Sequence, residues 1–343
     1  MRPTPALSIL MPVRDAAATL AACLDSIHAQ TLADFELLVV DDGSTDGTGA
    51  LLSARAREDV RLRVLKGPHR GLVACLNAGL RVARAPIVAR MDGDDLMVPE
   101  RLALQWEYLR AHPRVDVVAS RVEAFPAQDT GAGMEEYLRW QNACTAEDAL
   151  RDEIYVECPI THPSVMFRRD VVVAAGAYRD GDFPEDYELW LRLTERGCPM
   201  AKVDRCLLRW RQRDDSLSRI DPRYSRDAFD RLRARYLARD RRLRGERPVV
   251  FWGAGRRTRR RADHLVAHLA ASGISPGAWI DVDPRKIGQR IQEAPVVAPE
   301  WLREREPRPF VLSWVASHGA RDSIGAALEA MGYGRGVDYL AVG

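Results

Sequence analysis

The stretch IVARMDGDD, Ile87–Asp95, joins a strand-like apolar run to three carboxylates that fall within four residues. Ile87–Met91 has the length and composition of a buried β-strand, so Asp92, Asp94 and Asp95 are predicted to lie just beyond its carboxyl end. Carboxylates this close raise one another's pKa and cost stability unless positive charge lies between them. Because ligands of open α/β sheets bind at the carboxyl ends of the strands, the stretch predicts a cation-dependent ligand site.

Strand-length apolar runs alternate with helical patterns on both sides of this stretch. Runs rich in Val, Ile or Leu predict further strands at Leu7–Met11, Phe35–Val40, Arg61–Leu65 and Val115–Ala119. Apolar residues at i, i+3 and i+4 predict helices at Ala16–His28, Thr48–Arg57, Gly71–Arg84, Pro99–His112 and Asp186–Glu195. This alternation predicts an α/β domain with a mostly parallel, mixed sheet flanked by helices.

The length of 343 residues predicts about two domains. We expect the first domain at residues 1–222 and a smaller α/β domain at residues 248–343. Between them, residues 223–247 carry ten arginines and four acidic residues, which predicts a solvated basic helical linker. Over the whole chain Lys+Arg 51 balance Asp+Glu 49, so no global field indicates nucleic acid as a partner.

The cysteines and the hydropathy pattern indicate a cytoplasmic protein. Six cysteines are scattered without a Cys-x-x-Cys pair, which is typical of reduced thiols in a chain of this length. The N-terminus lacks the pattern of a signal peptide, and no run approaches the ~18–20 apolar residues of a membrane span. The arginine-rich segments leave open a peripheral contact with the inner face of the membrane, and homo-oligomer formation is also open.

A second acidic cluster, VVDDGSTDG, occupies Val39–Gly47 at the end of another predicted strand. An EF-hand loop is excluded because its twelfth position, which requires a bidentate Glu, is Ser53. A simple Asx turn before the next helix remains an alternative. Two carboxylate clusters at neighbouring strand ends favour a ligand site, and oxygen-only side chains there suit Mg²⁺ or Mn²⁺.

Four motifs in order resemble family 2 of the inverting glycosyltransferases over about residues 6–220. They are SILMPVRDAAATL with FELLVVDDGSTDGT, then APIVARMDGDDLMVPERL, then THPSVMFRRD, and finally FPEDYELWLRL. The resemblance implies a GT-A nucleotide-sugar-binding domain. It also implies a nucleotide-sugar donor, usually UDP-linked, and a divalent metal, Mn²⁺ or Mg²⁺, as cofactor.

The resemblance assigns roles in donor binding to several residues. Pro12, Arg14, Asp41 and Asp42 correspond to the nucleoside-binding edge of the family. Asp92 and Asp94 match its Asp-x-Asp motif, in which Asp92 faces ribose and metal and Asp94 ligates the metal that bridges the diphosphate. Related sequences carry a histidine where this chain has Arg213. Arginine cannot ligate a metal but pairs bidentately with phosphate, so Arg213 is expected to contact the donor diphosphate.

The remaining chemistry requires a base that deprotonates the acceptor hydroxyl. Asp186 matches the catalytic base of the family and Glu185 its acidic neighbour, whereas spacing alone would favour a helix cap at Asp186. His162 matches a residue of the acceptor pocket, with a buried structural histidine as the alternative. Arg192 is expected at a solvated helix position.

The C-terminal third opens with VVFWGAGRRTRRRADHL, a strand, a Gly-x-Gly turn and a helix. Such a turn suggests a dinucleotide site with Asp281 or Asp283 on a ribose. The third glycine is replaced, because Thr258 follows Gly253 and Gly255 where Gly is required. We therefore expect a Rossmann-like module without cofactor, used for acceptor docking or assembly, whose arginines face anionic saccharide, a membrane surface or solvent.

These patterns together predict an inverting glycosyltransferase that moves a sugar from a nucleotide-sugar donor to a saccharide or lipid-linked acceptor of a surface glycan. A nucleotidyltransferase making the sugar nucleotide is the first alternative. That reaction needs a glycine-rich loop after the first strand, and MPVRDAAATL has no glycine. A non-catalytic nucleotide-sugar-binding scaffold is the second alternative. An NAD-dependent oxidoreductase would need a Tyr-x-x-x-Lys or similar dyad, which does not accompany the Gly-x-Gly turn.

Overall fold

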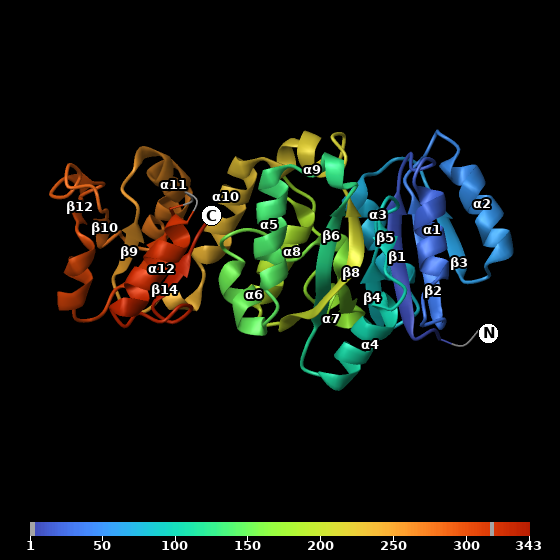
Figure 1. Ribbon diagram of the computed structural model, residues 1–343, viewed down its shortest axis with the longest axis horizontal. Coiled ribbons are helices and arrows are strands. Elements are labelled where there is room, and N and C mark those ends of the chain that lie inside the picture. The colour runs from blue at the N-terminus through green and yellow to red at the C-terminus, as the bar shows by residue number, and fades with distance from the viewer. Residues whose placement is uncertain (1–3, 316–318) are drawn as a thin grey trace. The chain divides into compact units, whose positions relative to one another are not determined.

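The structure is a computed structural model, and it describes residues 4–315 and 319–343 (Figure 1). The chain divides into two compact units. The N-terminal unit comprises Met1–Glu147, Pro159–Gly181 and Glu185–Ile220, and the C-terminal unit comprises Asp148–Cys158, Asp182–Pro184 and Asp221–Gly343. The domain boundaries expected from the sequence stay a prediction. No helix within the described residues is long and apolar enough to cross a membrane.

The N-terminal unit is built on a mixed sheet that has eight strands within the described residues, in the order β3-β2-β1-β4-β7-β6-β8-β5. The strands are β1 (Leu7–Val13), β2 (Phe35–Asp41), β3 (Leu62–Lys66), β4 (Ile87–Arg90), β5 (Leu96–Met97), β6 (Val117–Phe125), β7 (Met166–Arg168) and β8 (Met200–Arg211). The first four pair in parallel, and β7 is antiparallel to both β4 and β6. The predicted mixed α/β architecture is therefore confirmed.

Helices flank this sheet, as Figure 1 shows, and their positions follow the apolar periodicity. They are α1 (Leu20–His28), α2 (Thr48–Glu58), α3 (Leu72–Val82), α4 (Arg101–Ala111), α5 (Ala132–Ala143), α7 (Arg169–Ala174), α8 (Glu185–Glu195) and α9 (Leu217–Ile220). Helix α3 packs on β1 and β2, and α4 and α5 pack on β6. A Cβ at Gly79 of α3 would lie 2.1 Å from Leu10 Cδ1, so a larger residue there would require the buried Leu10 side chain to shift.

The strand order places the predicted site at one edge of the sheet. Strands β2 and β3 lie on one side of β1 and β4 lies on the other, so the strand order reverses between β1 and β4. Ligands of open α/β sheets bind at such a reversal, beyond the carboxyl ends of the strands. Arg14 follows β1, Asp41 and Asp42 lie at the end of β2, and Asp92 follows β4, so all four residues lie at this edge.

The C-terminal unit has its own sheet, with six strands in the described residues, ordered β11-β12-β10-β9-β13-β14. They are β9 (Val249–Trp252), β10 (Ala278–Ile280), β11 (Arg290–Ile291), β12 (Ala294–Val297), β13 (Phe310–Ser313) and β14 (Tyr339–Ala341). All pair in parallel except β11 with β12. The helices of this unit include α6 (Glu147–Glu153), most of which belongs to it, α10 (Arg226–Leu237), α11 (Arg256–Ala270) and α12 (Ala320–Ala330).

The segment 223–247 is less solvated than its arginine content predicts. Within it, α10 packs against α11. Arg233 is 1% exposed, and its guanidinium bonds the buried Asp230, which also accepts two hydrogen bonds from Arg261. The segment therefore contributes buried ion pairs to the C-terminal unit, because its apolar residues at helical spacing, such as Leu232, bring one face of α10 into the core.

Side chains of the C-terminal unit itself contact the Gly-x-Gly turn. Ala254 N donates to Asp281 Oδ2 over 2.9 Å, and Lys286 Nζ donates to the same oxygen over 3.0 Å. A Cβ at Gly253 would lie 2.8 Å from a Thr258 methyl group. Because the carboxylate expected on a ribose is bonded to the turn itself, the geometry argues against a dinucleotide there.

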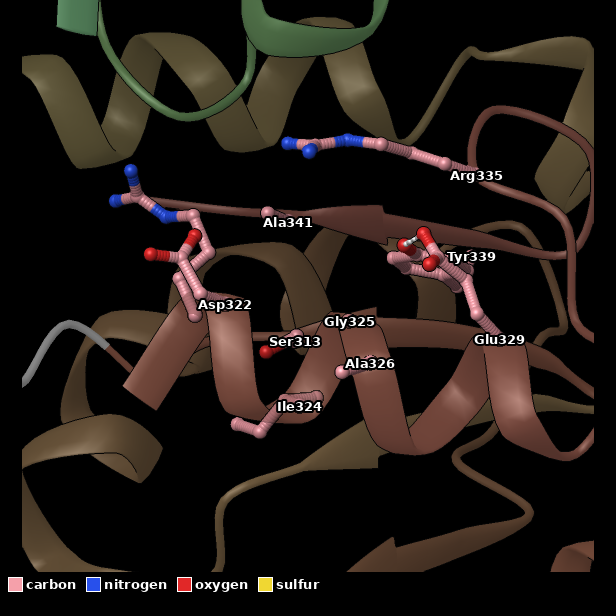
Figure 2. A pocket seen from close by; sticks show the side chains of 10 residues that line it. Ser313, Asp322, Ile324, Gly325, Ala326, Glu329, Arg335, Tyr339 and Ala341 are labelled. Carbon is pink, nitrogen blue, oxygen red and sulfur yellow. Dashed lines mark hydrogen bonds between the residues drawn. The ribbon is translucent and has the colours of Figure 1, made fainter. Parts of the chain in front are cut away.

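A cavity of about 190 Å³ lies elsewhere in the C-terminal unit, beside α12 and β14 (Figure 2). Figure 2 shows Tyr339 and Glu329 joined by a hydrogen bond, which spans 3.0 Å from Tyr339 Oη to Glu329 Oε1. Its charged lining residues carry both signs, Arg321 and Arg335 against Asp322 and Glu329. This lining gives no net preference for an anion or a cation.

Candidate active site

The three carboxylates after β4 have different partners. Asp92 Oδ1 lies 2.7 Å from Arg90 Nη1, and the Asp92 side chain is one third exposed. Asp95 is 1% exposed, and its Oδ1 accepts a 2.7 Å hydrogen bond from Arg211 N. Asp95 Oδ2 is buried without a hydrogen-bond partner in the described part of the chain. Asp94 Oδ2 lies 3.9 Å from Arg213 Nη1, so the structure brings these two predicted residues together.

The electrostatics of this loop fit a divalent cation. Burial and then repulsion by Asp92 raise the pKa of Asp94 to about 6, and burial with both neighbouring charges raises the pKa of Asp95 well above its usual range. The described residues contain no group of three or more His, Cys, Asp or Glu placed to hold a metal by themselves. Mg²⁺ and Mn²⁺ use one or two carboxylates together with substrate phosphates and water, so Asp92 and Asp94 match that mode.

Two buried arginines lie beneath the loop. Arg90 is 2% exposed and Arg101 of α4 is fully buried. Arg101 donates to Gln105 Oε1 and to the carbonyl of Arg90, and burial lowers its pKa to about 9, which keeps it charged at neutral pH. These guanidinium groups give part of the positive charge that the sequence requires around MDGDD.

The predicted nucleoside edge is assembled around Asp42. Its Oδ1 accepts a 2.7 Å hydrogen bond from Arg70 N, and its Oδ2 accepts bonds from Gly71 N and lies 2.7 Å from His69 Nδ1. Burial alone would raise the pKa of Asp42, but these hydrogen bonds hold it below the usual value. His69 Nε2 in turn lies 2.8 Å from Arg14 Nη1. Asp42 therefore orders the 69–71 turn that lies beside Arg14.

The other two predicted nucleoside residues lie on adjacent strands. Pro12 is buried in β1 and pairs in register with Val40 of β2. Asp41, at the end of β2, accepts a 3.0 Å hydrogen bond from Ser44 N through Oδ1. This bond closes the Asx turn that the sequence predicts. Asp41 therefore stabilises the turn and also lies at the ligand edge of the sheet.

Asp186 lies in the first turn of α8, next to Glu185. Its Oδ1 accepts a 2.7 Å hydrogen bond from the adjacent Tyr187 N, whereas an N-cap side chain bonds the amide two or three residues on. Burial, followed by the charge of Glu185, raises the pKa of Asp186 to about 8. A carboxylate with a pKa near neutrality is suited to accept a proton.

His162 lies beside Glu185 of α8 and is 7% exposed. Its Nε2 lies 2.8 Å from Tyr178 Oη, and its Nδ1 lies 3.9 Å from Glu185 Oε1. Burial, together with the charge of Arg90, lowers its pKa well below the usual range, so the ring is neutral at physiological pH. The acceptor-pocket role of His162 stays a prediction.

The expectation that Arg192 is solvated is wrong. Arg192 is 2% exposed, and its guanidinium bonds both oxygens of Glu188 one turn earlier. It also donates to the carbonyls of Ala175 and Ala177. These hydrogen bonds hold α8 against the turn at residues 175–177. The Glu188–Arg192 ion pair could have been predicted, because residues four apart face each other on a helix.

Sequence reasoning missed several residues of the site. Arg90 could have been found as a charge inside the apolar run IVAR, because a buried strand tolerates an arginine only with a partner. Arg211 ends β8 and holds the loop through the backbone oxygen of Asp94 and the carboxylate of Asp95. Tyr178 and His69 could not be predicted from the sequence, because their partners His162 and Asp42 come from other segments of the chain.

Comparison with known proteins agrees with this geometry. Residues 8–174 match the family model described as "Glycosyl transferase family 2". The amylovoran biosynthesis glycosyltransferase AmsE of Erwinia amylovora is 32% identical over 198 residues, which span 57% of this chain and 72% of that protein. The Escherichia coli UDP-Gal:alpha-D-GlcNAc-diphosphoundecaprenol beta-1,3-galactosyltransferase is 26% identical over 209 residues, 60% of this chain and 74% of that protein.

A solved structure shows the same fold. S. aureus TarS 1–349 in complex with UDP-GlcNAc aligns with a TM-score of 0.55 at 17% identity, over 77% of this chain and 72% of that one. This likeness confirms the predicted GT-A type of fold. The match to the family model, at residues 8–174, includes the two segments that carry the carboxylate clusters. The chain is therefore a glycosyltransferase and belongs to glycosyl transferase family 2.

Proposed function

We propose that the protein is an inverting, metal-assisted glycosyltransferase that uses a UDP-sugar and acts in the synthesis of a surface glycan. One observation carries the proposal. Asp92 and Asp94 follow β4 at the ligand edge of the sheet, and the charge of Arg90 acts both on Asp92 and on Glu185 beside Asp186. Donor-side and base-side carboxylates therefore lie within electrostatic reach of one another.

The base would be Asp186. Its carboxylate takes the proton of the acceptor hydroxyl while the hydroxyl oxygen bonds to the anomeric carbon of the donor. The bond from that carbon to the diphosphate oxygen breaks at the same time, and the nucleoside diphosphate leaves with the electron pair. Attack opposite to the leaving group inverts the anomeric centre. With a pKa of about 8, Asp186 is a strong base in its ionised form, and the ionised fraction increases as pH rises toward 8.

The donor would be held at the edge formed by β1, β2 and β4. Asp94 and Asp92 would hold a divalent cation, which when bound neutralises charge on the departing diphosphate. Arg213 would pair with the diphosphate. Its Nε and Nη2 bond the exposed Asp215, its Nη1 lies 3.9 Å from Asp94, and its side chain is 39% exposed. Arg14, Pro12, Asp41 and Asp42 would contact the nucleoside.

The donor and acceptor classes are supported by a relative. The name of the Escherichia coli galactosyltransferase gives its donor as UDP-Gal and its acceptor as a sugar on diphosphoundecaprenol. We propose the same classes here, a UDP-sugar and a saccharide or lipid-linked acceptor, with His162 near the acceptor.

A thermal-shift screen of nucleotide sugars, with and without Mn²⁺, tests the donor class. We expect UDP-sugars to raise Tm only with Mn²⁺, and NMR of the product to show an inverted anomeric centre. Retention of configuration, or equal stabilisation by all nucleotides without metal, would contradict the proposal.

A further inference from the structure

Arg90 is a charged residue in the most buried part of the sheet. It ends β4, where every residue is buried, and its side chain is 2% exposed. A guanidinium group in such a place costs much free energy unless charge and hydrogen bonds compensate. Its compensation comes from Asp92, whose Oδ1 lies 2.7 Å from Arg90 Nη1.

The hydrogen bonds of Arg90 differ from those of a structural arginine. Arg90 Nη1 also donates to the carbonyl of Met91, but its Nε is buried without a partner in the described part of the chain. Arg192, which is equally buried, uses its Nε and both terminal nitrogens on Glu188 and two carbonyls. The fold therefore leaves one hydrogen-bond donor of Arg90, its Nε, unsatisfied among the described residues, although the guanidinium keeps its charge.

The charge of Arg90 faces two groups of carboxylates. On the donor side it acts on Asp92 and Asp95. On the base side, Arg90 N donates to Val165 O over 2.9 Å, directly after the 162–164 turn, whose His162 Nδ1 lies 3.9 Å from Glu185 Oε1. The charge of Arg90 acts there on Glu185 and Asp186 of α8 and on the buried His162 and Tyr178. Burial would lower the pKa of Arg90, and the surrounding negative charges, Asp92 first, raise it instead.

We propose that Arg90 is a positioning residue that serves both halves of the reaction. It holds one oxygen of Asp92, so that the other oxygen of this partly exposed carboxylate is the one open to the donor and its cation. It also places a fixed positive charge beside the base, which favours ionised Asp186. This inference rests on the proposed function, because it assigns Arg90 to residues whose roles are proposed there.

Loss of the Arg90 charge therefore has two separate effects. Asp92 loses its partner, and outer-shell partners of this kind are worth about 10- to 100-fold in metal affinity. Asp186 loses a positive charge that lowers its pKa, so this pKa rises further. The acid limb of the pH profile must move to higher pH by the same amount, since the base acts only when ionised.

The test compares Arg90→Met with Arg192→Met in the full-length protein. We expect Arg90→Met to weaken Mn²⁺ in the presence of UDP about 10- to 100-fold, followed by thermal shift, and to move the acid limb of kcat/KM upward. Arg90→Lys keeps the charge and should keep the acid limb while still weakening Mn²⁺. Arg192→Met is the control, with a lowered Tm but an unmoved acid limb and unchanged Mn²⁺ affinity.

An unmoved acid limb and unchanged Mn²⁺ affinity in Arg90→Met would overturn the inference. Should Arg90→Met fail to fold, Arg90→Gln replaces it, because Gln also lacks the charge but keeps a polar side chain. The expected results are the same. Asp186→Asn separates this inference from the proposed function. If Asp186→Asn keeps full activity, the proposed base is wrong. If it is inactive while the Arg90 variants behave like the control, only the role of Arg90 is wrong.

Discussion

Replacing Asp186 by Asn should make the folded protein more stable while it removes activity. The pKa of this carboxyl rises from 3.8 to about 8, a change of about four units. At 1.36 kcal/mol per unit, the ceiling on the cost of the buried charge is about 5 kcal/mol. Because Asp186 keeps part of its contact with solvent, we expect about 2 kcal/mol to be realised. That corresponds to a rise in Tm of roughly 4–8 °C for a domain of this size.

The sign of the effect depends on pH. A raised folded-state pKa gives stability that is fully present below pH 3.8 and is lost as pH rises to about 8. Asn is neutral throughout, so the difference in Tm between Asp186→Asn and the native protein should widen from pH 5 to pH 8. Scanning calorimetry over that range measures it, and the rate of transfer should fall by about 10²–10⁴. A Tm difference that is flat with pH, or a less stable variant at pH 8, would refute the reasoning.

Three further predictions follow from the site and the second unit. Asp94→Asn should abolish the Mn²⁺-dependent stabilisation by UDP without lowering Tm at pH 7, because it also removes repulsion with Asp92; unchanged turnover would contradict the assignment. Arg213→Ala should weaken UDP more than uridine in calorimetry, and Arg213→His should preserve metal dependence; equal weakening of both ligands would place Arg213 elsewhere. Calorimetry of the full chain with NAD(H) and NADP(H) should show no binding, because Asp281 is bonded to its own turn; micromolar binding would reverse this conclusion.

The elements with strong apolar periodicity could be predicted closely. The strand predicted at Phe35–Val40 is β2 at Phe35–Asp41, and the helix predicted at Asp186–Glu195 is α8 at Glu185–Glu195. The bounds of such elements follow from the local spacing of their apolar residues, because each element buries its apolar face against its own sheet. Residues 120–180 could not be predicted in the same way, because they hold short elements whose order depends on distant partners.

The site was predictable at the strand ends and less so in its supporting shell. Carboxylates that follow a strand indicate a ligand edge without knowledge of the fold. The partners of those carboxylates come from elsewhere in the chain, as with Arg211, whose amide meets Asp95 over 116 positions of sequence. The Arg192 prediction failed in part for the same reason, because two of its five hydrogen bonds go to carbonyls 15–17 positions earlier.

The C-terminal unit includes Asp148–Cys158, which lies within the family-matched residues 8–174, and this affects how the enzyme can be divided. Asp152 and Arg242 pair over 2.7 Å, Tyr155 Oη bonds Asp240, and Gly343 N, at the last residue, donates to Tyr155 O. A protein cut after residue 220 would keep residues 148–158 without the side chains and backbone that cover them. Loss of the tail by truncation or proteolysis would leave an incompletely folded catalytic chain, so the two units are expected to persist or be lost together.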